Sequence, residues 1–129
     1  NLFKSNNEKS VLTVFTDVEC TYCRKFHSEI NEYLENGVSI NYLAFPRTGI
    51  DSSSYKKMVA AWCSDEKKES ITNLKNDVDI AMTSCENPVE KHFEIGRRIG
   101  VTGTPAIITQ TGLLLPGYVP ANELVAIIE

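Results

Sequence analysis

The sequence predicts an α/β domain, and three stretches carry this prediction. An unbroken run of apolar and β-branched residues at 11–16 suits a buried strand and is too short to cross a membrane. Directly after it, apolar side chains switch to helical spacing between positions 23 and 34. Near the C-terminus, short apolar runs at 106–109 and 113–115 flank a Thr-Gly turn and predict a hairpin.

Capping and stop signals define the remaining elements. The first helix, from about Thr21 to Glu35, stops at Asn36-Gly37, which is a good C-terminal signal. Asn87 caps a later helix that has Pro88 at its first position. The expected order is a polar linker or lead-in at 1–10, a strand at 11–16, a helix at 21–35, a strand at 38–45, a helical insertion at about 50–87, a helix at 88–99, strands at 106–109 and 113–115, and a helix at 121–128.

Length and charge narrow the classes of function. A chain of 129 residues fits one domain with a real core, expected at 11–129. The formal net charge of −4 provides no basic patch, so we expect no nucleic-acid partner. The chain shows no apolar run of membrane length, no signal peptide and no starting methionine, which suggests a mature or trimmed protein.

The stretch Cys20-Thr21-Tyr22-Cys23 lies at the junction of the first strand and the first helix. A CxxC in this position is typical of a thioredoxin-like redox site. The first N–H groups of a helix lack acceptors and the helix dipole is positive there, so a thiolate at Cys20 is stabilised and its pKa falls. Cys23 lies one turn further in and should be more buried. We therefore expect Cys20 to be the nucleophile and Cys23 the resolving thiol.

Two other interpretations of the CxxC are a structural zinc site and an inert disulfide. A zinc site usually needs a second ligand pair at suitable spacing. Cys63 and Cys85 are isolated from each other, and His27 and His92 belong to no ligand motif. We expect redox chemistry, with no metal and no cofactor.

The other two cysteines allow a second disulfide. If the CxxC pairs internally, Cys63 is left with Cys85, and a bond closing their loop of roughly 20 residues would stabilise the fold by about 3 kcal/mol. Such a structural disulfide would imply an oxidising compartment. Two buried free thiols are the alternative, and the residues alone leave the choice open.

The predicted order, βαβ followed by ββα, is the thioredoxin arrangement with a helical insertion. Beyond this, several segments closely resemble the catalytic domain of DsbC-type protein disulfide isomerases of the bacterial periplasm. The resemblance covers nearly the whole chain from about Val11 onward, and it departs at Thr21, where the family often has glycine. The segments that carry it are FTDVECTYCRKFH, YLAFPRTG, AAWC, VTGTPA and LLLPGY.

The resemblance implies roles for particular residues. Cys20 matches the cysteine that attacks misformed disulfides, and Thr104-Pro105 matches a Thr–cis-Pro pair that faces the sulfurs. Cys63 and Cys85 match a structural disulfide, which decides the open choice in favour of a bond. We expect substrate to bind at Thr21, Tyr22, Thr104 and Pro105, with strand-like hydrogen bonds to the Thr104 backbone. Tyr22 and Tyr118 either add apolar contact near the sulfurs or are ordinary packing.

The function implied is a disulfide isomerase or reductase that acts on misoxidised or unfolded proteins in the periplasm. The resemblance also implies a membrane-bound DsbD-like electron donor. In the family an N-terminal domain forms a homodimer; this chain has no room for that domain and is expected to be monomeric. Two alternatives stay open: a DsbG-like reductase of sulfenylated cysteines, and a redox-inert peptide-binding chaperone module.

Overall fold

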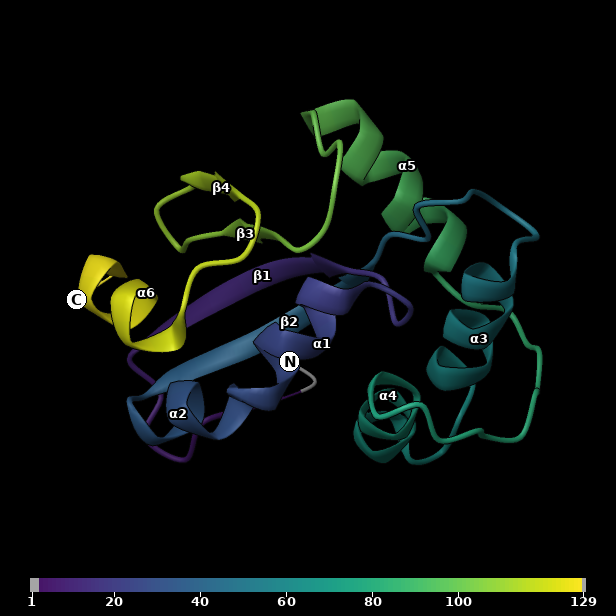
Figure 1. Ribbon diagram of the computed structural model, residues 1–129, viewed down its shortest axis with the longest axis horizontal. Coiled ribbons are helices and arrows are strands. Elements are labelled where there is room, and N and C mark those ends of the chain that lie inside the picture. The colour runs from purple at the N-terminus through teal and green to yellow at the C-terminus, as the bar shows by residue number, and fades with distance from the viewer. Residues whose placement is uncertain (1–2, 129) are drawn as a thin grey trace.

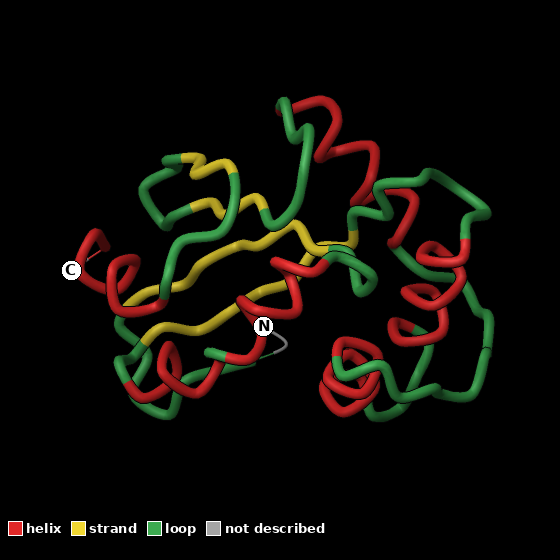
Figure 2. Tube along the Cα trace, viewed as in Figure 1, coloured by secondary structure: helices red, strands yellow, loops and turns green. Residues whose placement is uncertain are grey.

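The computed structural model describes residues 3–128, and these fold around a mixed sheet in which four strands are assigned (Figures 1 and 2). The spatial order is β2-β1-β3-β4. The strands are β1 (Ser10–Thr16), β2 (Val38–Ala44), β3 (Ala106–Ile108) and β4 (Leu114–Pro116). β2 runs parallel to β1, and the C-terminal hairpin joins the other edge of β1 in antiparallel orientation. The predicted βαβ and ββα order is confirmed.

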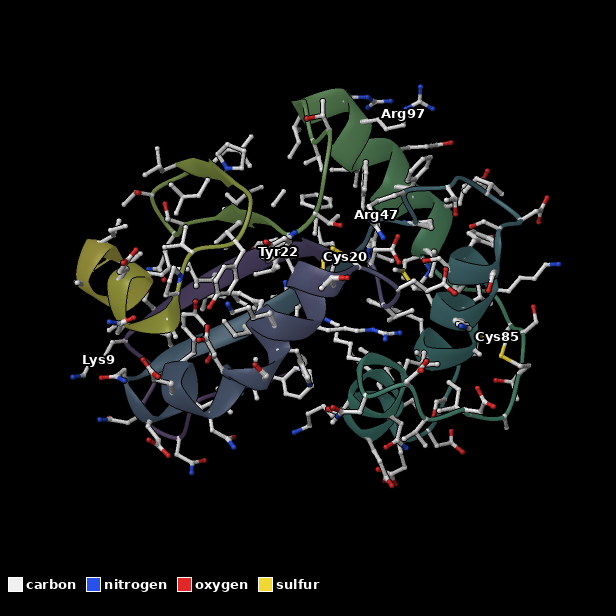
Figure 3. The ribbon with its side chains drawn as sticks, viewed as in Figure 1. Lys9, Cys20, Tyr22, Arg47, Cys85 and Arg97 are labelled. Carbon is white, nitrogen blue, oxygen red and sulfur yellow. A yellow bond between two sulfur atoms is a disulfide. The ribbon has the colours of Figure 1, made fainter. Side chains whose placement is uncertain are left out.

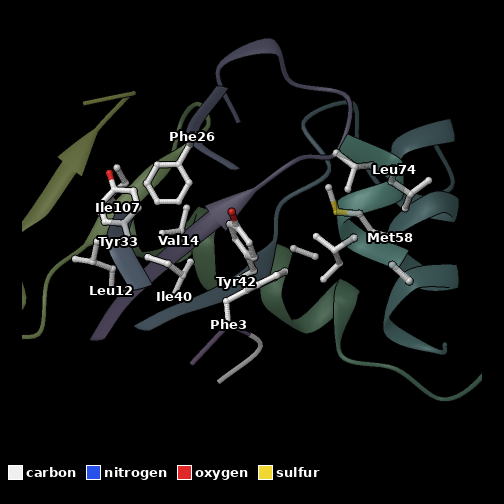
Figure 4. Packing of buried hydrophobic residues seen from close by; sticks show 14 of the residues in the cluster. Phe3, Leu12, Val14, Phe26, Tyr33, Ile40, Tyr42, Met58, Leu74 and Ile107 are labelled. Atoms are coloured by element: carbon white, nitrogen blue, oxygen red, sulfur yellow. The ribbon is translucent and has the colours of Figure 1, made fainter. Parts of the chain in front are cut away.

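Each face of the sheet carries its own core because side chains alternate along β1. Leu12 and Val14 point into the larger cluster, where Phe26 and Tyr33 cover them (Figure 4). Phe15 points to the opposite face and packs edge-on against Phe45, with ring centroids 6.2 Å apart. The larger core is covered by α1 (Thr21–Ser28), α2 (Ile30–Glu35) and α6 (Ala121–Ile128), and it extends to α3 (Ser53–Trp62) and α4 (Lys67–Lys75). α5 (Val89–Ile99) covers the other face through Phe93.

The first helix differs from its prediction because it is divided at Glu29. Glu29 has φ −101° and ψ 12°, and its N–H bonds to Phe26 as in a tight terminal turn. Its carboxylate accepts hydrogen bonds from the Tyr118 hydroxyl at 2.7 Å and from the Ala121 N–H at 3.2 Å. The break therefore lies where Glu29 bonds to the beginning of α6. The local sequence pattern does not predict this contact.

The helical insertion lies to one side of the sheet (Figure 1). It consists of α3 (Ser53–Trp62), α4 (Lys67–Lys75) and an extended return to residue 88. Ser52 caps α3, since its hydroxyl accepts from the Tyr55 N–H at 3.2 Å. A disulfide joins Cys63 to Cys85, with Cα atoms 5.7 Å apart, and fastens the return segment to the end of α3.

The N-terminal segment packs more closely than its polar composition suggests. Phe3 forms a bridge with Ile40 of β2, and its ring meets Tyr42 edge-on at 5.7 Å (Figure 4). Ser5 is also buried, and its hydroxyl donates to the carbonyl of Leu34 at 2.7 Å. From Phe3 onward the expected lead-in is thus part of the folded body.

A close approach on the second face depends on one glycine. A Cβ atom at Gly96 would lie 2.7 Å from the Phe45 ring, so only glycine lets α5 lie this near to the sheet. α5 begins one residue later than predicted, with Pro88 at the cap position, yet Asn87 still accepts from the Val89 N–H at 3.0 Å. Among residues 3–128, no helix is long and apolar enough to span a membrane.

The Cys63–Cys85 bond should resist mild reductant that acts on the CxxC. It closes a loop with a sequence separation of 22, so replacing both cysteines by alanine should lower the free energy of unfolding by about 3 kcal/mol. Thiol counting after gentle reduction, together with urea unfolding of the double variant, measures both effects. Four alkylated cysteines in protein that is still folded would contradict the expectation.

Candidate functional site

The CxxC lies where β1 ends and α1 begins, near the centre of the molecule (Figure 3). Cys20 occupies the N-cap position with extended backbone, and its sulfur accepts from the Cys23 N–H at 3.4 Å. Cys20 retains 3% of its surface and Cys23 none, so only the first sulfur is open to a substrate. Both cysteines are free thiols in this structure.

The surroundings of the two sulfurs push their acidities apart. The pKa of Cys20 is lowered to about 5, first by the hydrogen bond that the Cys23 thiol donates and further by the Thr104 hydroxyl and the Cys23 N–H, while burial opposes the shift. Burial raises the pKa of Cys23, and its hydrogen bond to Cys20 raises it further. At neutral pH Cys20 is therefore a thiolate and Cys23 a thiol.

The Thr104–Pro105 segment faces the site from the loop before β3. The peptide bond between these residues is cis, and the Cys20 Sγ lies 3.4 Å from the Thr104 carbonyl oxygen. Within residues 3–128 the Thr104 hydroxyl is buried and has no hydrogen-bond partner in this thiol form. A buried hydroxyl without an acceptor is costly, and a thiolate at Cys20 supplies that acceptor.

A pocket of about 210 Å³ adjoins Thr104 on the side of the hairpin. The loop 100–104 forms one wall, and Leu114, Pro116 and Gly117 form the other. In the part of the chain that the structure describes, the Thr104 N–H donates no hydrogen bond. This free backbone edge beside the sulfur suits an extended peptide added as a strand.

Two tyrosines form an aromatic surface on the other side of Cys20. Tyr22 is 57% exposed at the beginning of α1, and its ring stacks on Tyr118 with centroids 6.0 Å apart. The ammonium of Lys25 lies 5.1 Å from the centre of the Tyr118 ring. Thr21 is exposed beside Tyr22. Of the four residues expected to bind substrate, the structure thus brings Thr21, Tyr22 and Thr104 to the rim of the CxxC, and Pro105 follows Thr104 as a buried residue.

Sequence reasoning missed the part played by Arg47. Its guanidinium Nε donates to the buried carboxylate of Asp17 at 3.0 Å, and its charge lowers the pKa of Cys20 (Figure 3). Asp17 also accepts from Ser54 and from the N–H groups of Glu19 and Arg47, so it organises the loop before the CxxC. The segment YLAFPRTG contains Arg47, but nothing local indicates that it reaches the sulfurs.

Two charges next to the cysteines in sequence point elsewhere. Arg24 donates to the Val18 carbonyl at 2.9 Å and lies 3.7 Å from Asp77. Glu19, which precedes Cys20, is paired with Lys57 at 2.9 Å. Among the described residues no group of His, Cys, Asp or Glu could hold a metal ion.

Comparisons with known proteins agree with this geometry. The family model described as a thioredoxin-like domain matches residues 1–129. The thiol:disulfide interchange protein DsbC of Escherichia coli is 40% identical over 123 residues, which are 95% of this chain and 52% of that protein. The DsbC protein of Dickeya dadantii is 38% identical over 129 residues, 54% of its length. This chain therefore spans about half the length of these relatives.

Solved structures show the same fold. The disulfide interchange protein from Neisseria gonorrhoeae superposes with a TM-score of 0.85 at 25% identity, covering 98% of this chain and 89% of that one. The catalytic domain of Proteus mirabilis ScsC gives a TM-score of 0.69 at 26% identity, covering 98% and 85% of the two chains. The helical insertion and the mixed sheet thus belong to a known architecture.

The low pKa of Cys20 should be visible in its alkylation. With a pKa of about 5, the rate with iodoacetamide should be nearly constant from pH 9 to pH 6 and fall about ten-fold per pH unit below 5. Stopped aliquots analysed by mass spectrometry measure this rate, and the Cys20→Ser variant should show no fast phase. A rate that first rises near pH 8.5, as for an ordinary thiol, would contradict the assignment.

Proposed function

The chain belongs to the thioredoxin-like domain family, and from this premise we propose that it is a thiol–disulfide oxidoreductase that reduces and isomerises misformed disulfides in proteins. The observation that carries the proposal is the lowered pKa of Cys20, which keeps a small exposed fraction and lies one turn before the wholly buried thiol of Cys23. A thiolate that is both ionised at neutral pH and next to a second thiol can begin and complete exchange.

The exchange proceeds in two steps. The Cys20 thiolate attacks one sulfur of a substrate disulfide, the other substrate sulfur leaves as a thiolate, and a mixed disulfide remains. Cys23 then attacks Cys20, which closes the Cys20–Cys23 bond and releases reduced substrate. Alternatively, a different substrate thiol displaces Cys20, and the result is an isomerised substrate with the enzyme still reduced.

Substrate recognition would use the backbone and the rim of the site rather than a shaped pocket. The free N–H of Thr104 can pair with an extended chain, and the pocket beside it can take a side chain of that chain. Tyr22 and Tyr118 provide an exposed apolar surface near the sulfur. Such contacts suit unfolded or misoxidised proteins of many sequences.

We place this activity in the periplasm. The Cys63–Cys85 disulfide favours an oxidising compartment, and the relatives named DsbC support the same assignment. Repeated reduction requires an electron donor that reopens the Cys20–Cys23 bond, and a membrane-bound DsbD-like protein fits this need. In a longer protein, residues 11–129 would be the catalytic domain, residues 3–10 would pack onto it as they do here, and dimerisation would lie outside both.

The two alternatives differ from this proposal in chemistry. A redox-inert chaperone module has no use for a thiolate, so the lowered pKa of Cys20 speaks against it. A reductase of sulfenylated cysteines would use the same attack by Cys20 on a single oxidised sulfur. A comparison of rates on a sulfenylated protein and on a scrambled disulfide substrate distinguishes these activities.

Variants of the two cysteines test the roles directly. Cys20→Ser should abolish exchange, whereas Cys23→Ser should keep the attack but lose release, so that mixed disulfides with substrate accumulate. Non-reducing gels of each variant incubated with scrambled ribonuclease show these adducts. Adducts that form with Cys20→Ser and not with Cys23→Ser would mean that the roles are reversed.

The chain of 129 residues should reduce disulfides well and isomerise them poorly. Reduction needs only Cys20 and Cys23, whereas isomerisation needs a substrate that stays bound while a second substrate thiol competes with Cys23. A dimer with two facing sites holds substrate through its effective concentration. Insulin reduction and recovery of scrambled ribonuclease should be measured for this chain and for its fusion to a dimerising coiled coil. Equal recovery by both would contradict the expectation.

A further inference from the structure

A lysine is buried beneath the redox site. Lys75, at the end of α4, is 4% exposed, and its ammonium donates to the Thr16 hydroxyl at 2.8 Å. The same nitrogen lies 3.8 Å from the centre of the Tyr42 ring, which gives a cation–π contact. Taking an ammonium out of water is costly, and within residues 3–128 no carboxylate forms an ion pair with this one.

The groups around Lys75 come from several elements. His27 of α1 bonds to the Tyr42 hydroxyl and to Thr72, each at 2.9 Å, and burial lowers the pKa of His27 to about 3, so this ring is neutral. Burial lowers the pKa of Lys75 itself to about 7, while Cys23, Cys20 and Asp17 act in the opposite direction. Cys23 exerts the largest of these opposing effects.

Lys75 packs near α1, the helix that carries the resolving cysteine. Its ammonium donates to Thr16, the last residue of β1, and lies over the Tyr42 ring, whose hydroxyl bonds to His27, one turn after Cys23 on α1. Burial and the bond to Cys20 make the Cys23 thiol a poor acid, and Lys75 is the strongest influence that lowers its pKa. Cys20 takes its own low pKa from Cys23, Thr104 and Arg47 instead.

We propose that Lys75 is a positioning residue for the release step, in which its charge favours the thiolate of Cys23. This inference rests on the proposed exchange function and assigns a different group to each of its two steps. The groups around Cys20 activate its attack on the substrate disulfide, and Lys75 activates the attack of Cys23 on the mixed disulfide.

The step balances without any further reactant. Cys23 gives its proton to water, and its thiolate attacks the Cys20 sulfur of the mixed disulfide. The Cys20–Cys23 bond forms, the bond between Cys20 and the substrate breaks, and the substrate sulfur leaves as a thiolate that takes a proton from water. The two cysteines are oxidised and the substrate disulfide is reduced.

The test separates the two steps with Ellman's reagent, which releases one coloured thiolate when Cys20 attacks and a second when Cys23 resolves the adduct. Lys75→Met keeps a long apolar side chain and removes the charge. It should slow the second phase about three-fold for each unit by which the Cys23 pKa rises, because the thiolate fraction falls while the remaining thiolate becomes more nucleophilic. The first phase should stay within about two-fold, and the pH profile of the second phase should move to higher pH.

Lys68→Met is the matched control, since Lys68 lies exposed on the same helix, and both phases should be unchanged in it. A second phase that Lys75→Met leaves unaltered at every pH would overturn the inference, as would equal slowing of both phases. If the unaltered protein shows no first phase, the proposed function itself fails.

A second variant remains decisive if Lys75→Met does not fold. Lys75→Arg keeps its charge at every pH tested, whereas burial lowers the pKa of Lys75 to about 7, so that the lysine is largely uncharged at pH 9. The second phase of Lys75→Arg should therefore be faster than that of the unaltered protein at pH 9 and equal to it at pH 6. Equal second phases at both pH values would overturn the inference.

Discussion

The redox chemistry of this structure depends on the position of the Cys20 sulfur at the N-cap of α1. Cys20 can occupy the N-cap only because β1 ends at Thr16 and the loop 17–19 turns back toward the sheet. That loop is held by the buried carboxylate of Asp17, which accepts hydrogen bonds from Ser54, Glu19 and Arg47. The first N–H groups of the helix have no acceptor within it, and they stabilise a thiolate at Cys20. The beginning of α1 after β1 therefore makes Cys20 reactive.

The helical insertion contributes to the chemistry as well as to the core. α4 carries Lys75 to the end of β1, and its neighbour α3 supplies Ser54 to the loop carboxylate. The Cys63–Cys85 bond fastens the chain that returns from these helices, and so it keeps them beside the sheet. Without these contacts, Asp17 in the loop before the CxxC would lose the hydrogen bond from Ser54. The redox site would also lose the buried ammonium of Lys75.

The two cysteines have opposite acidities because they are unequally buried and unequally hydrogen-bonded. Cys20 receives donors from Cys23, Thr104 and the helix terminus, whereas Cys23 donates and lies wholly inside. This asymmetry suits a nucleophile that meets substrate and a second thiol that acts only after the first has reacted. Because burial disfavours the thiolate of Cys23, release requires a positive charge that favours it, and Lys75 is the group that we propose for this role.

The sequence alone determined the elements whose evidence is local. The apolar run at 11–16, the CxxC at a helix start and the Thr-Gly turn are each visible within a few residues, and they led to the order of elements and to Cys20 as nucleophile. Tertiary structure decided the contacts between segments far apart in the chain. The break at Glu29 coincides with a bond to Tyr118, the charge near Cys20 comes from Arg47, and the buried cation comes from Lys75. The burial and the pKa of a side chain depend on residues that are distant in sequence and close in space. The periodicity of the sequence does not identify these neighbours.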